Sequence, residues 1–274
     1  MIRYEISKFL AAERIGDRGS GQISSHVEFE SGANLQNCKY CTMTSLELIY
    51  FDIPGKGEAI RLAAAYAGLP LVDNRISREE FVRLKENGEL KYGQVPALRV
   101  NGTTVVNQSA AIMRYLGRIT SKPGLLYPTD PLDAAYVDSI VDQEIDLFTG
   151  LSVSRYKQRF GFGILDTEEN GEDAEKLTAK VRKELNDVVI PRHLENFEKL
   201  MSASTTGWIA NTETPSIADF ILVPRLVWLR EHGEGIAESI LDPYKGLLAM
   251  MDKLLSLEEV KDYYASLANK KQKV

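Results

Sequence analysis

The sequence predicts a small α/β domain followed by an all-α domain. Between residues 46 and 119, short apolar runs typical of strands alternate with segments whose apolar residues recur at helical spacing. Beyond residue 131 the strand-like runs disappear, and only the helical spacing continues. A stretch with three prolines, KPGLLYPTDP at residues 122–131, separates the two patterns, because prolines favour an extended connection over a continuing helix.

The first half shows the order β-α-β-α-β-β-α, which predicts a small mixed sheet with helices on its faces. LELIYF and LVDNRIS predict strands, and GEAIRLAAAYAG predicts a helix that ends at Gly68. Residues 78–91 predict a second helix, and residues 109–119 a third. Between them PALRVNGTTVVN predicts a hairpin, because Asn101-Gly102 is the strongest short hairpin signal in the chain.

The second half predicts helices only. One apolar stripe runs from Leu132 to Phe148, and another begins at Leu177. Pro191 falls within the second stretch, so VVIPRHLENFEKLM is either a kinked helix or two helices that meet. SIADF predicts a capping-box variant that opens a buried helix through Trp228. Between the first two stripes, SVSRYKQRFGFGILDTEENGED predicts an irregular tip that could cover a pocket.

Composition and charge exclude several classes of partner. The chain has 274 residues and is 44% hydrophobic, which suffices for two cores. Its net charge of −6 argues against nucleic acid, because no basic stripe is available for a phosphate backbone. No apolar run approaches the roughly 20 residues that cross a bilayer, and the N-terminus lacks a secretory signal. We therefore expect a soluble, cytoplasmic protein.

Residues 1–42 differ from the rest and predict a disordered extension, or an extended gene model. They show little periodic hydrophobicity, and their five basic residues are balanced by five acidic ones, unlike an organellar leader. Cys38 and Cys41 have the spacing of a redox dithiol, but no apolar strand precedes them. We expect two thiols without a catalytic role.

Metal and nucleotide sites are not predicted. His26, His193 and His232 have no partner at metal-ligand spacing. GKG at residues 55–57 lacks the further glycines and the GK[ST] of a phosphate loop.

Three motifs point to a known family. LIYFDIPGKGEAIR, KYGQVPAL and NQSAAIMRYLGR, in this order and at this spacing, resemble the tyrosine-type cytosolic glutathione transferases. The resemblance covers about residues 45–268 and is greatest to the sigma class, which includes haematopoietic prostaglandin D synthases. It implies a thioredoxin-like glutathione-binding domain over residues 43–122, a linker over 123–131 and a helical-bundle domain for the electrophile over 132–274.

Tyr50 is the predicted catalytic residue. A free cysteinyl thiol has a pKa near 8.5, and only its thiolate is a good nucleophile. A hydroxyl that donates a hydrogen bond to sulfur favours the thiolate. In the family this hydroxyl belongs to the tyrosine that ends the first strand, and Tyr50 stands there. Without the other motifs, Tyr50 would be interpreted as an ordinary strand aromatic.

The resemblance also assigns the residues that bind glutathione. Val95 and Pro96 would pair with the cysteinyl unit through a cis peptide bond, although most X-Pro bonds are trans. Gln108 and Ser109 would bind the γ-glutamyl carboxylate at a helix start, where Ser109 alone predicts an N-cap. Lys56 stands where relatives carry an arginine beside the thiolate. For the glycine carboxylate, relatives carry a tryptophan and a lysine, and Phe81 and Lys85 stand at those positions. Gln94 is the last residue that the resemblance assigns to glutathione binding.

The resemblance implies a homodimer in which Asp146 reaches the ligand's ammonium in the partner subunit. Asp138 and Asp142 precede it on the same helix face, so a solvated acidic face is the alternative. The electrophile would be small and apolar, and aromatic residues of the second half are the candidates for its site: Phe148, Tyr156, Phe160 and Phe162. Glutathione acts as co-substrate, and no cofactor is implied.

Two alternatives stay open. The same activated sulfur would serve a glutathione-dependent isomerase or peroxidase of the prostaglandin D synthase type. The second alternative is a non-catalytic relative with a structural or interaction role. Such a protein would not need to retain the full set of predicted site residues, Tyr50, Gln94, Pro96, Gln108 and Ser109. A thioredoxin-like redox protein is disfavoured because Cys38 and Cys41 precede the first strand.

Overall fold

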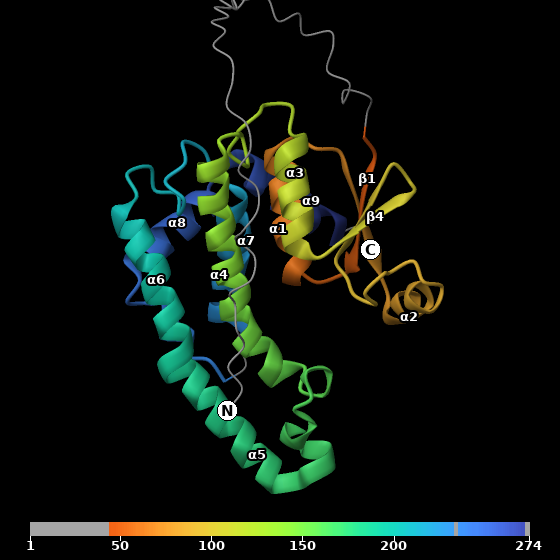
Figure 1. Cartoon of the computed structure of the whole chain (residues 1–274), viewed down its shortest axis with the longest axis vertical. Coiled ribbons are helices and arrows are strands. Elements are labelled where there is room, and N and C mark those ends of the chain that lie inside the picture. Colours follow the sequence, from red (N-terminus) through yellow and green to blue (C-terminus); the bar gives the residue numbers. More distant parts are fainter. Residues whose placement is uncertain (1–43, 233–234, 272–274) are drawn as a thin grey trace, which may run out of the picture. The chain divides into compact units, whose positions relative to one another are not determined.

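The computed structural model describes residues 44–232 and 235–271. Cys38, Cys41 and the predicted N-terminal extension lie outside the described residues. The first half contains β1 (Leu46–Phe51), η1 (Gly55–Gly57), α1 (Glu58–Tyr66), β2 (Leu71–Ile76), α2 (Arg78–Glu86), β3 (Ala97–Val100), β4 (Thr104–Asn107) and α3 (Ser109–Ile119). This order confirms the predicted β-α-β-α-β-β-α pattern (Figure 1).

The four strands form one mixed sheet in the order β2-β1-β3-β4. β1 and β2 are parallel, with Tyr50 opposite Arg75, whereas β3 is antiparallel to both β1 and β4. Asn101 and Gly102 join β3 to β4 with φ angles of 52° and 72°, values that Asn and Gly adopt more readily than other residues. The predicted hairpin is therefore confirmed.

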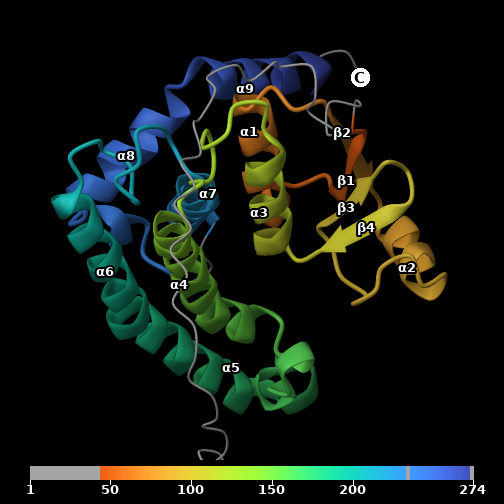
Figure 2. The same ribbon diagram turned by 45° about the horizontal axis from the view of Figure 1, so that its top comes forward.

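The two faces of the sheet are covered by different helices. Side chains alternate across a strand, so Leu48 and Tyr50 of β1 share one face and Ile49 points to the other. The first two belong to a large apolar cluster with residues of α1 and α3, and Ile49 packs with Leu84 of α2 in a smaller one. Figure 2 shows α1 and α3 side by side, with α2 beyond the strands. Tyr50 therefore faces the larger cluster.

The described residues of the second half form helices joined by turns and contain no strand, as predicted. Its longer elements are α4 (Pro131–Arg155), α5 (Thr167–Glu184), α6 (Ile190–Ala203), α7 (Ile217–His232), α8 (Lys245–Leu255) and α9 (Glu258–Lys271). Its short turns are η2 (Gln158–Phe160), η3 (Gly163–Leu165), η4 (Leu185–Val189) and η5 (Glu238–Leu241). Among the described helices, none is both long enough and apolar enough to span a bilayer.

Local signals explain where these helices begin and end. Asp130 caps α4 by accepting the N–H groups of Leu132 and Asp133 at 2.8 and 3.0 Å, directly before a proline in the first turn. The predicted irregular tip starts later than expected, because SVSR still belongs to α4. Near Pro191 two helices meet: a π-helical turn, η4, joins α5 to α6, and the proline lies in the first turn of α6.

α7 connects the two halves of the fold. Asp219 accepts the Ser216 N–H at 2.8 Å, and Ser216 Oγ accepts the Ala218 N–H at 3.3 Å, which confirms the predicted capping-box variant. From this start α7 packs against α4 and α8 as well as α1 and η1 of the first half. α7 of the second half thus contacts the turn that follows Tyr50; Gly57 in that turn is buried, whereas residues 52–55 are exposed.

Candidate active site

The Tyr50 hydroxyl is held by the turn that follows its own strand. Tyr50 is 7% exposed, and its hydroxyl oxygen accepts the backbone N–H of Lys56 at 3.0 Å. A phenol has one proton to donate and two lone pairs to accept with. Because the Lys56 N–H occupies a lone pair, the hydroxyl proton is left to be donated to another group.

Two glycines explain why a Pro-Gly-Lys-Gly turn follows the tyrosine. Gly55 has a φ of +43°, and a Cβ there would overlap the Tyr50 hydroxyl oxygen. A Cβ at Gly57 would lie 2.5 Å from the Tyr50 ring. The turn therefore lies directly on the aromatic ring, and only glycine permits this close approach.

Burial keeps the Tyr50 hydroxyl protonated. Desolvation raises the pKa of Tyr50 above its usual value of 10.0, and the hydrogen bond from the Lys56 N–H opposes this effect. The Tyr156 hydroxyl raises the pKa further, whereas the charges of Arg61 and Arg225 lower it. At neutral pH Tyr50 is therefore a hydrogen-bond donor and not a tyrosinate.

Arg61 of α1 fixes the backbone that carries this hydroxyl. The side chain is 2% exposed in the core, and its charge is balanced by Asp73 at 3.0 Å and Glu58 at 3.3 Å. It also donates to the carbonyl oxygens of Ile53 at 2.8 Å and Phe51 at 3.2 Å. These bonds tie the end of β1 and the following turn to α1.

A cluster of cations and aromatic rings adjoins the turn. The Lys56 ammonium lies 4.6 Å from the centroid of the Phe148 ring, and the Arg225 guanidinium carbon lies 3.7 Å from the same centroid. Arg225 also donates to Glu144 Oε1 at 2.7 Å. Burial lowers the pKa of Lys56, Glu144 raises it, and Arg225 lowers it further.

The residues predicted to hold the middle of glutathione lie on the loop before β3 and at the start of α3. The Val95–Pro96 peptide bond is cis, as the resemblance implied. Ser109 is not the N-cap of α3: that position is held by Gln108, without a side-chain cap, and Ser109 is the first helical residue. Gln108 has a φ of +71°, a strained value of the kind that is frequent at functional sites.

The residues predicted for the glycine carboxylate lie on and near α2. The Phe81 ring packs on Phe51, with centroids 5.4 Å apart, and belongs to the smaller apolar cluster. The Lys85 side chain is exposed, and a Cβ at Gly93 would lie 3.2 Å from its Cε, so its stem runs along that turn. Gln94 follows, partly exposed.

The three acidic residues on one face of α4, Asp138, Asp142 and Asp146, have different surroundings. Asp138 and Asp142 bind Arg114 of α3 at 2.6 and 2.8 Å, so they are not simply a solvated face. Asp146, one turn further, is exposed. Burial and Arg192 lower the pKa of His193, and the Asp146 carboxylate opposes them.

The predicted electrophile residues differ in exposure. Phe148 is partly buried and its ring lies edge-on to Trp228, 6.4 Å between centroids. Tyr156 follows the end of α4 and is 47% exposed, and its hydroxyl raises the pKa of Tyr50. Phe160 of η2 is 37% exposed beneath Arg159, and Phe162 is 44% exposed.

Comparisons with known proteins agree with this geometry. Family models match residues 46–118, described as "Glutathione S-transferase, N-terminal domain", and residues 168–267, described as "Glutathione S-transferase, C-terminal domain". Glutathione S-transferase 1 of Ascaris suum is 34% identical over 224 residues, which is 81% of this chain and 97% of the relative.

The chain belongs to the glutathione S-transferase family. Solved structures of the family confirm the predicted thioredoxin-like and helical domains. The glutathione S-transferase of Ascaris lumbricoides has a TM-score of 0.62 and 32% identity, and prostaglandin synthase D of Nilaparvata lugens has a TM-score of 0.65 and 28% identity. Each alignment covers 81% of this chain and 97% of the other.

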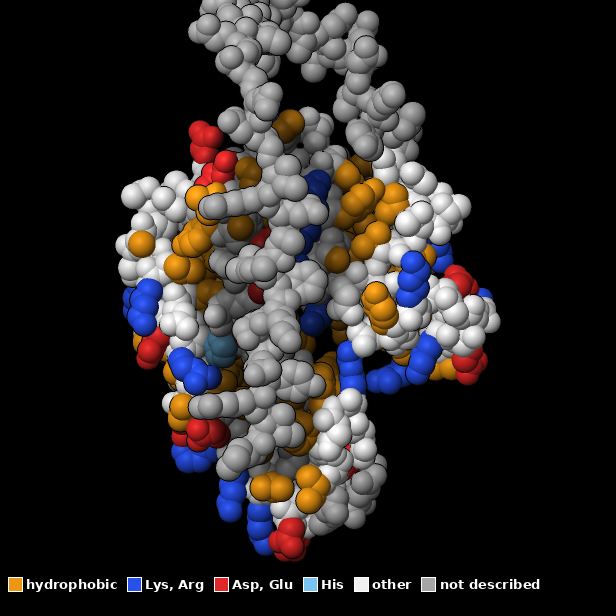
Figure 3. All heavy atoms as spheres, in the orientation of Figure 1, with side chains coloured by type: hydrophobic (Ala, Val, Ile, Leu, Met, Phe, Trp, Pro, Cys, Tyr) orange, Lys and Arg blue, Asp and Glu red, His pale blue; other side chains and the backbone are white. Residues whose placement is uncertain are grey.

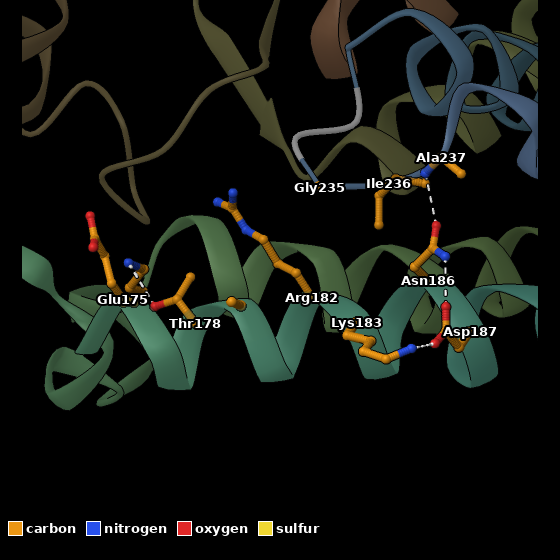
Figure 4. Close-up of a pocket in the computed structure, with 11 residues that line it drawn as sticks. Glu175, Thr178, Arg182, Lys183, Asn186, Asp187, Gly235, Ile236 and Ala237 are labelled. Atoms are coloured by element: carbon orange, nitrogen blue, oxygen red, sulfur yellow. Dashed lines mark hydrogen bonds and ion pairs between the residues drawn. The ribbon is translucent and has the colours of Figure 1, made fainter. Parts of the chain in front are cut away.

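One cavity of this transferase-family fold is lined by residues of the second half alone. It has a volume of about 790 Å³ and lies between α5 and the segment 235–237 (Figure 4). Asn186 accepts the Ala237 N–H at 2.8 Å and donates to Asp187, which also binds Lys183. None of the predicted binding residues lines this cavity.

Charged groups elsewhere on the described surface are mixed. On the face shown in Figure 3, Lys and Arg alternate with Asp and Glu along α5 and around α2, as on an ordinary solvated surface. Within residues 44–232 and 235–271, no group of three or more His, Cys, Asp or Glu side chains could hold a metal ion.

Proposed function

We propose that the chain is a glutathione transferase in which Tyr50 activates the thiol. The observation that carries this proposal is the Tyr50 hydroxyl, buried at the end of β1, whose oxygen accepts the Lys56 N–H at 3.0 Å while its proton stays available. Hydrogen bonding to sulfur favours the thiolate over the thiol. Each pKa unit by which the thiol is lowered corresponds to about 1.4 kcal/mol.

The reaction then needs little more than positioning. The thiol loses its proton to solvent, and the sulfur lone pair forms a bond to the electrophilic carbon. A leaving group departs with its electron pair, or, in an addition, the adjacent carbon takes up a proton from water. Burial of the site strengthens the hydrogen bond to sulfur, because few water molecules compete for it. No cofactor beyond the co-substrate glutathione enters this scheme.

Each remaining part of glutathione is assigned its own group of binding residues. The backbone of Val95 would pair with the cysteinyl unit, as an added strand does. The N–H groups at Gln108 and Ser109 point from the start of α3, where an anion is stabilised, and would receive the γ-glutamyl carboxylate. Lys85 and Gln94 would bind the glycine carboxylate beside Phe81.

An apolar electrophile would lie beside the aromatic residues after Glu144. Phe148, Tyr156 and Phe160 come from α4, its C-terminal end and η2, on the helical side of Tyr50. Their rings supply apolar contact area, and the partial exposure of Tyr156 and Phe160 leaves that area accessible to a small molecule.

Assembly, class and location are part of the same proposal. The exposed Asp146 would reach the ammonium of glutathione in the second subunit of a homodimer, and the motif resemblance supports a sigma-like class. A detoxifying role in the cytoplasm follows from the same resemblance.

Calorimetry with glutathione, followed by conjugation assays with aryl halides and α,β-unsaturated carbonyls, tests the proposal. Micromolar to millimolar binding and turnover above the uncatalysed rate are expected. Binding without turnover of any electrophile would favour the non-catalytic alternative.

A glutathione-dependent isomerase is the second candidate, because relatives with that kind of name match the chain. The haematopoietic prostaglandin D synthase of Gallus gallus is 37% identical over 100 residues, 36% of this chain and 47% of the relative. Isomerisation of a cyclic peroxide in the absence of conjugation would favour this candidate over the transferase.

A further inference from the structure

Arg225 is a charged residue in an apolar helix. It stands in the run FILVPRLVWL of α7 and is 8% exposed. A buried charge is tolerated only where other groups compensate for the lost water. Glu144 provides the countercharge at 2.7 Å, and the rings of Phe148 and Trp228 lie 3.7 and 5.7 Å from the guanidinium carbon. The guanidinium is therefore fixed on several sides.

This fixed guanidinium lies at the thiol site and not merely between two helices. α7 packs against η1, the turn whose backbone holds the Tyr50 hydroxyl. Arg225 also shares the Phe148 ring with the Lys56 ammonium. The positive charge of Arg225 lowers the pKa of Lys56. It also lowers the pKa of Tyr50, although burial raises that pKa by more.

The group formed by Lys56, Arg225 and Glu144 carries one positive charge in excess. Lys56 and Arg225 contribute two cations, and Glu144 contributes one carboxylate. From the other packed elements, Arg61 of α1 pairs with Glu58 and Asp73, and Asp73 also pairs with Arg75 of β2. Arg155, whose guanidinium carbon lies 5.8 Å from the Trp228 ring, and Arg159 of η2 are both exposed and are screened by solvent. One anion beside Tyr50 would neutralise the excess positive charge of Lys56, Arg225 and Glu144.

We propose that Arg225 supplies the thiol site with a second positive charge, which favours loss of the glutathione S–H proton to solvent and stabilises the thiolate beside Tyr50. The inference rests on the proposed function. Arg225 acts through the field and through the position of Lys56, so it is a positioning residue.

Five variants test this role: Arg225→Gln, Arg225→Lys, Glu144→Gln, the double variant Glu144→Gln/Arg225→Gln, and Arg114→Gln. The double variant avoids an unpaired buried carboxylate; it is compared with Glu144→Gln, so that only the cation differs, and it carries the test if Arg225→Gln does not fold. Arg114→Gln is the matched control, because Arg114 also bridges α4 to another helix, at Asp138 and Asp142. For each protein, the ultraviolet absorbance of the thiolate of bound glutathione is followed against pH, and the Kd is measured by calorimetry.

We expect Arg225→Gln to raise the pKa of the bound thiol above that of the wild type, and the double variant to raise it above that of Glu144→Gln, by about one unit in each case, as removal of a nearby cation does, with the Kd changed less than about twofold. Arg225→Lys and Arg114→Gln should stay near the wild-type value. A merely structural role would shift the melting temperature and leave the thiol pKa unchanged, and that result would overturn the inference alone. A wild-type protein that binds no glutathione, or does not lower its thiol pKa, would overturn both the inference and the proposed function.

Discussion

The two ends of the candidate site are built differently. At the thiol end, Tyr50, Arg61 and Arg225 are each less than a tenth exposed and are held by contacts from several elements. At the glycine end, the Lys85 side chain is exposed. Among the residues that the structure describes, its ammonium forms no ion pair. Buried charges and dipoles act strongly and need precise partners, whereas exposed charges act weakly.

This difference separates chemistry from binding. A displacement at the thiol end changes the stabilisation of an anion beside buried donors and charges, so it should change turnover. A change at the glycine end removes one screened contact among several, so it should change affinity by a small factor.

The largest effect is expected for Arg61→Leu. The substitution leaves Glu58 and Asp73 without their buried cation and two carbonyl oxygens without a donor, which costs about 3 to 5 kcal/mol of folding stability. Denaturant unfolding measures the loss. Arg83→Leu is the control, because Arg83 pairs with Glu80 at the surface; equal losses in both variants would contradict the contrast between the two ends.

Tyr50→Phe should lower kcat about a hundredfold, as loss of one buried donor to a developing anion does. The Kd for glutathione should stay within about twofold, because the ring still fills its place. Steady-state kinetics and calorimetry separate the two quantities. Tyr66→Phe, a partly buried tyrosine that packs on Phe220, is the control and should retain activity. Unchanged kcat in Tyr50→Phe would remove this hydroxyl from the mechanism.

Gly55→Ala should lower kcat about tenfold by pushing the turn away from the hydroxyl. Gly68→Ala is a matched control, since Gly68 also has a positive φ, +62°, but has open space where a Cβ would go. Both variants carry about 1 kcal/mol of backbone strain, so their melting temperatures should fall together. If their activities also fall together, contact between Gly55 and Tyr50 is unimportant.

Lys85→Ala should have the smallest effect, raising the Kd for glutathione about three- to fivefold with kcat unchanged. High salt should reduce the difference, because the ammonium is exposed. Lys91→Ala, another exposed lysine of the same region, should bind glutathione as the wild type does. An unaltered Kd in Lys85→Ala would remove Lys85 from the carboxylate site.

Local patterns in the sequence predicted most of the fold. The β-α-β-α-β-β-α order, the Asn101-Gly102 hairpin and the Ser216–Asp219 cap all depend on short-range signals, and all are confirmed. The N-cap of α3 was predicted wrongly, because Ser109 is a favourable cap by type but Gln108 takes that position with a positive φ. A strained backbone imposed by surrounding structure leaves no sign in local preference.

The site could be predicted only in part. Motif resemblance pointed to Tyr50, Val95, Pro96 and Gln108, whereas Arg225, Glu144 and Arg61 were missed as parts of it. Arg225 and Glu144 are 81 residues apart, and their pairing depends on how α4 packs on α7. One signal was available: an arginine within the apolar run FILVPRLVWL requires a buried partner.

The most direct test of the central claim is a titration of the thiol of bound glutathione, in the wild type and in Tyr50→Phe. The thiolate absorbance should rise at a pH well below the pKa of about 8.5 of a free thiol, and Tyr50→Phe should move that rise back toward it. A wild-type midpoint that equals that of free glutathione, or one that Tyr50→Phe does not change, would contradict the assignment of Tyr50 as the group that activates the thiol.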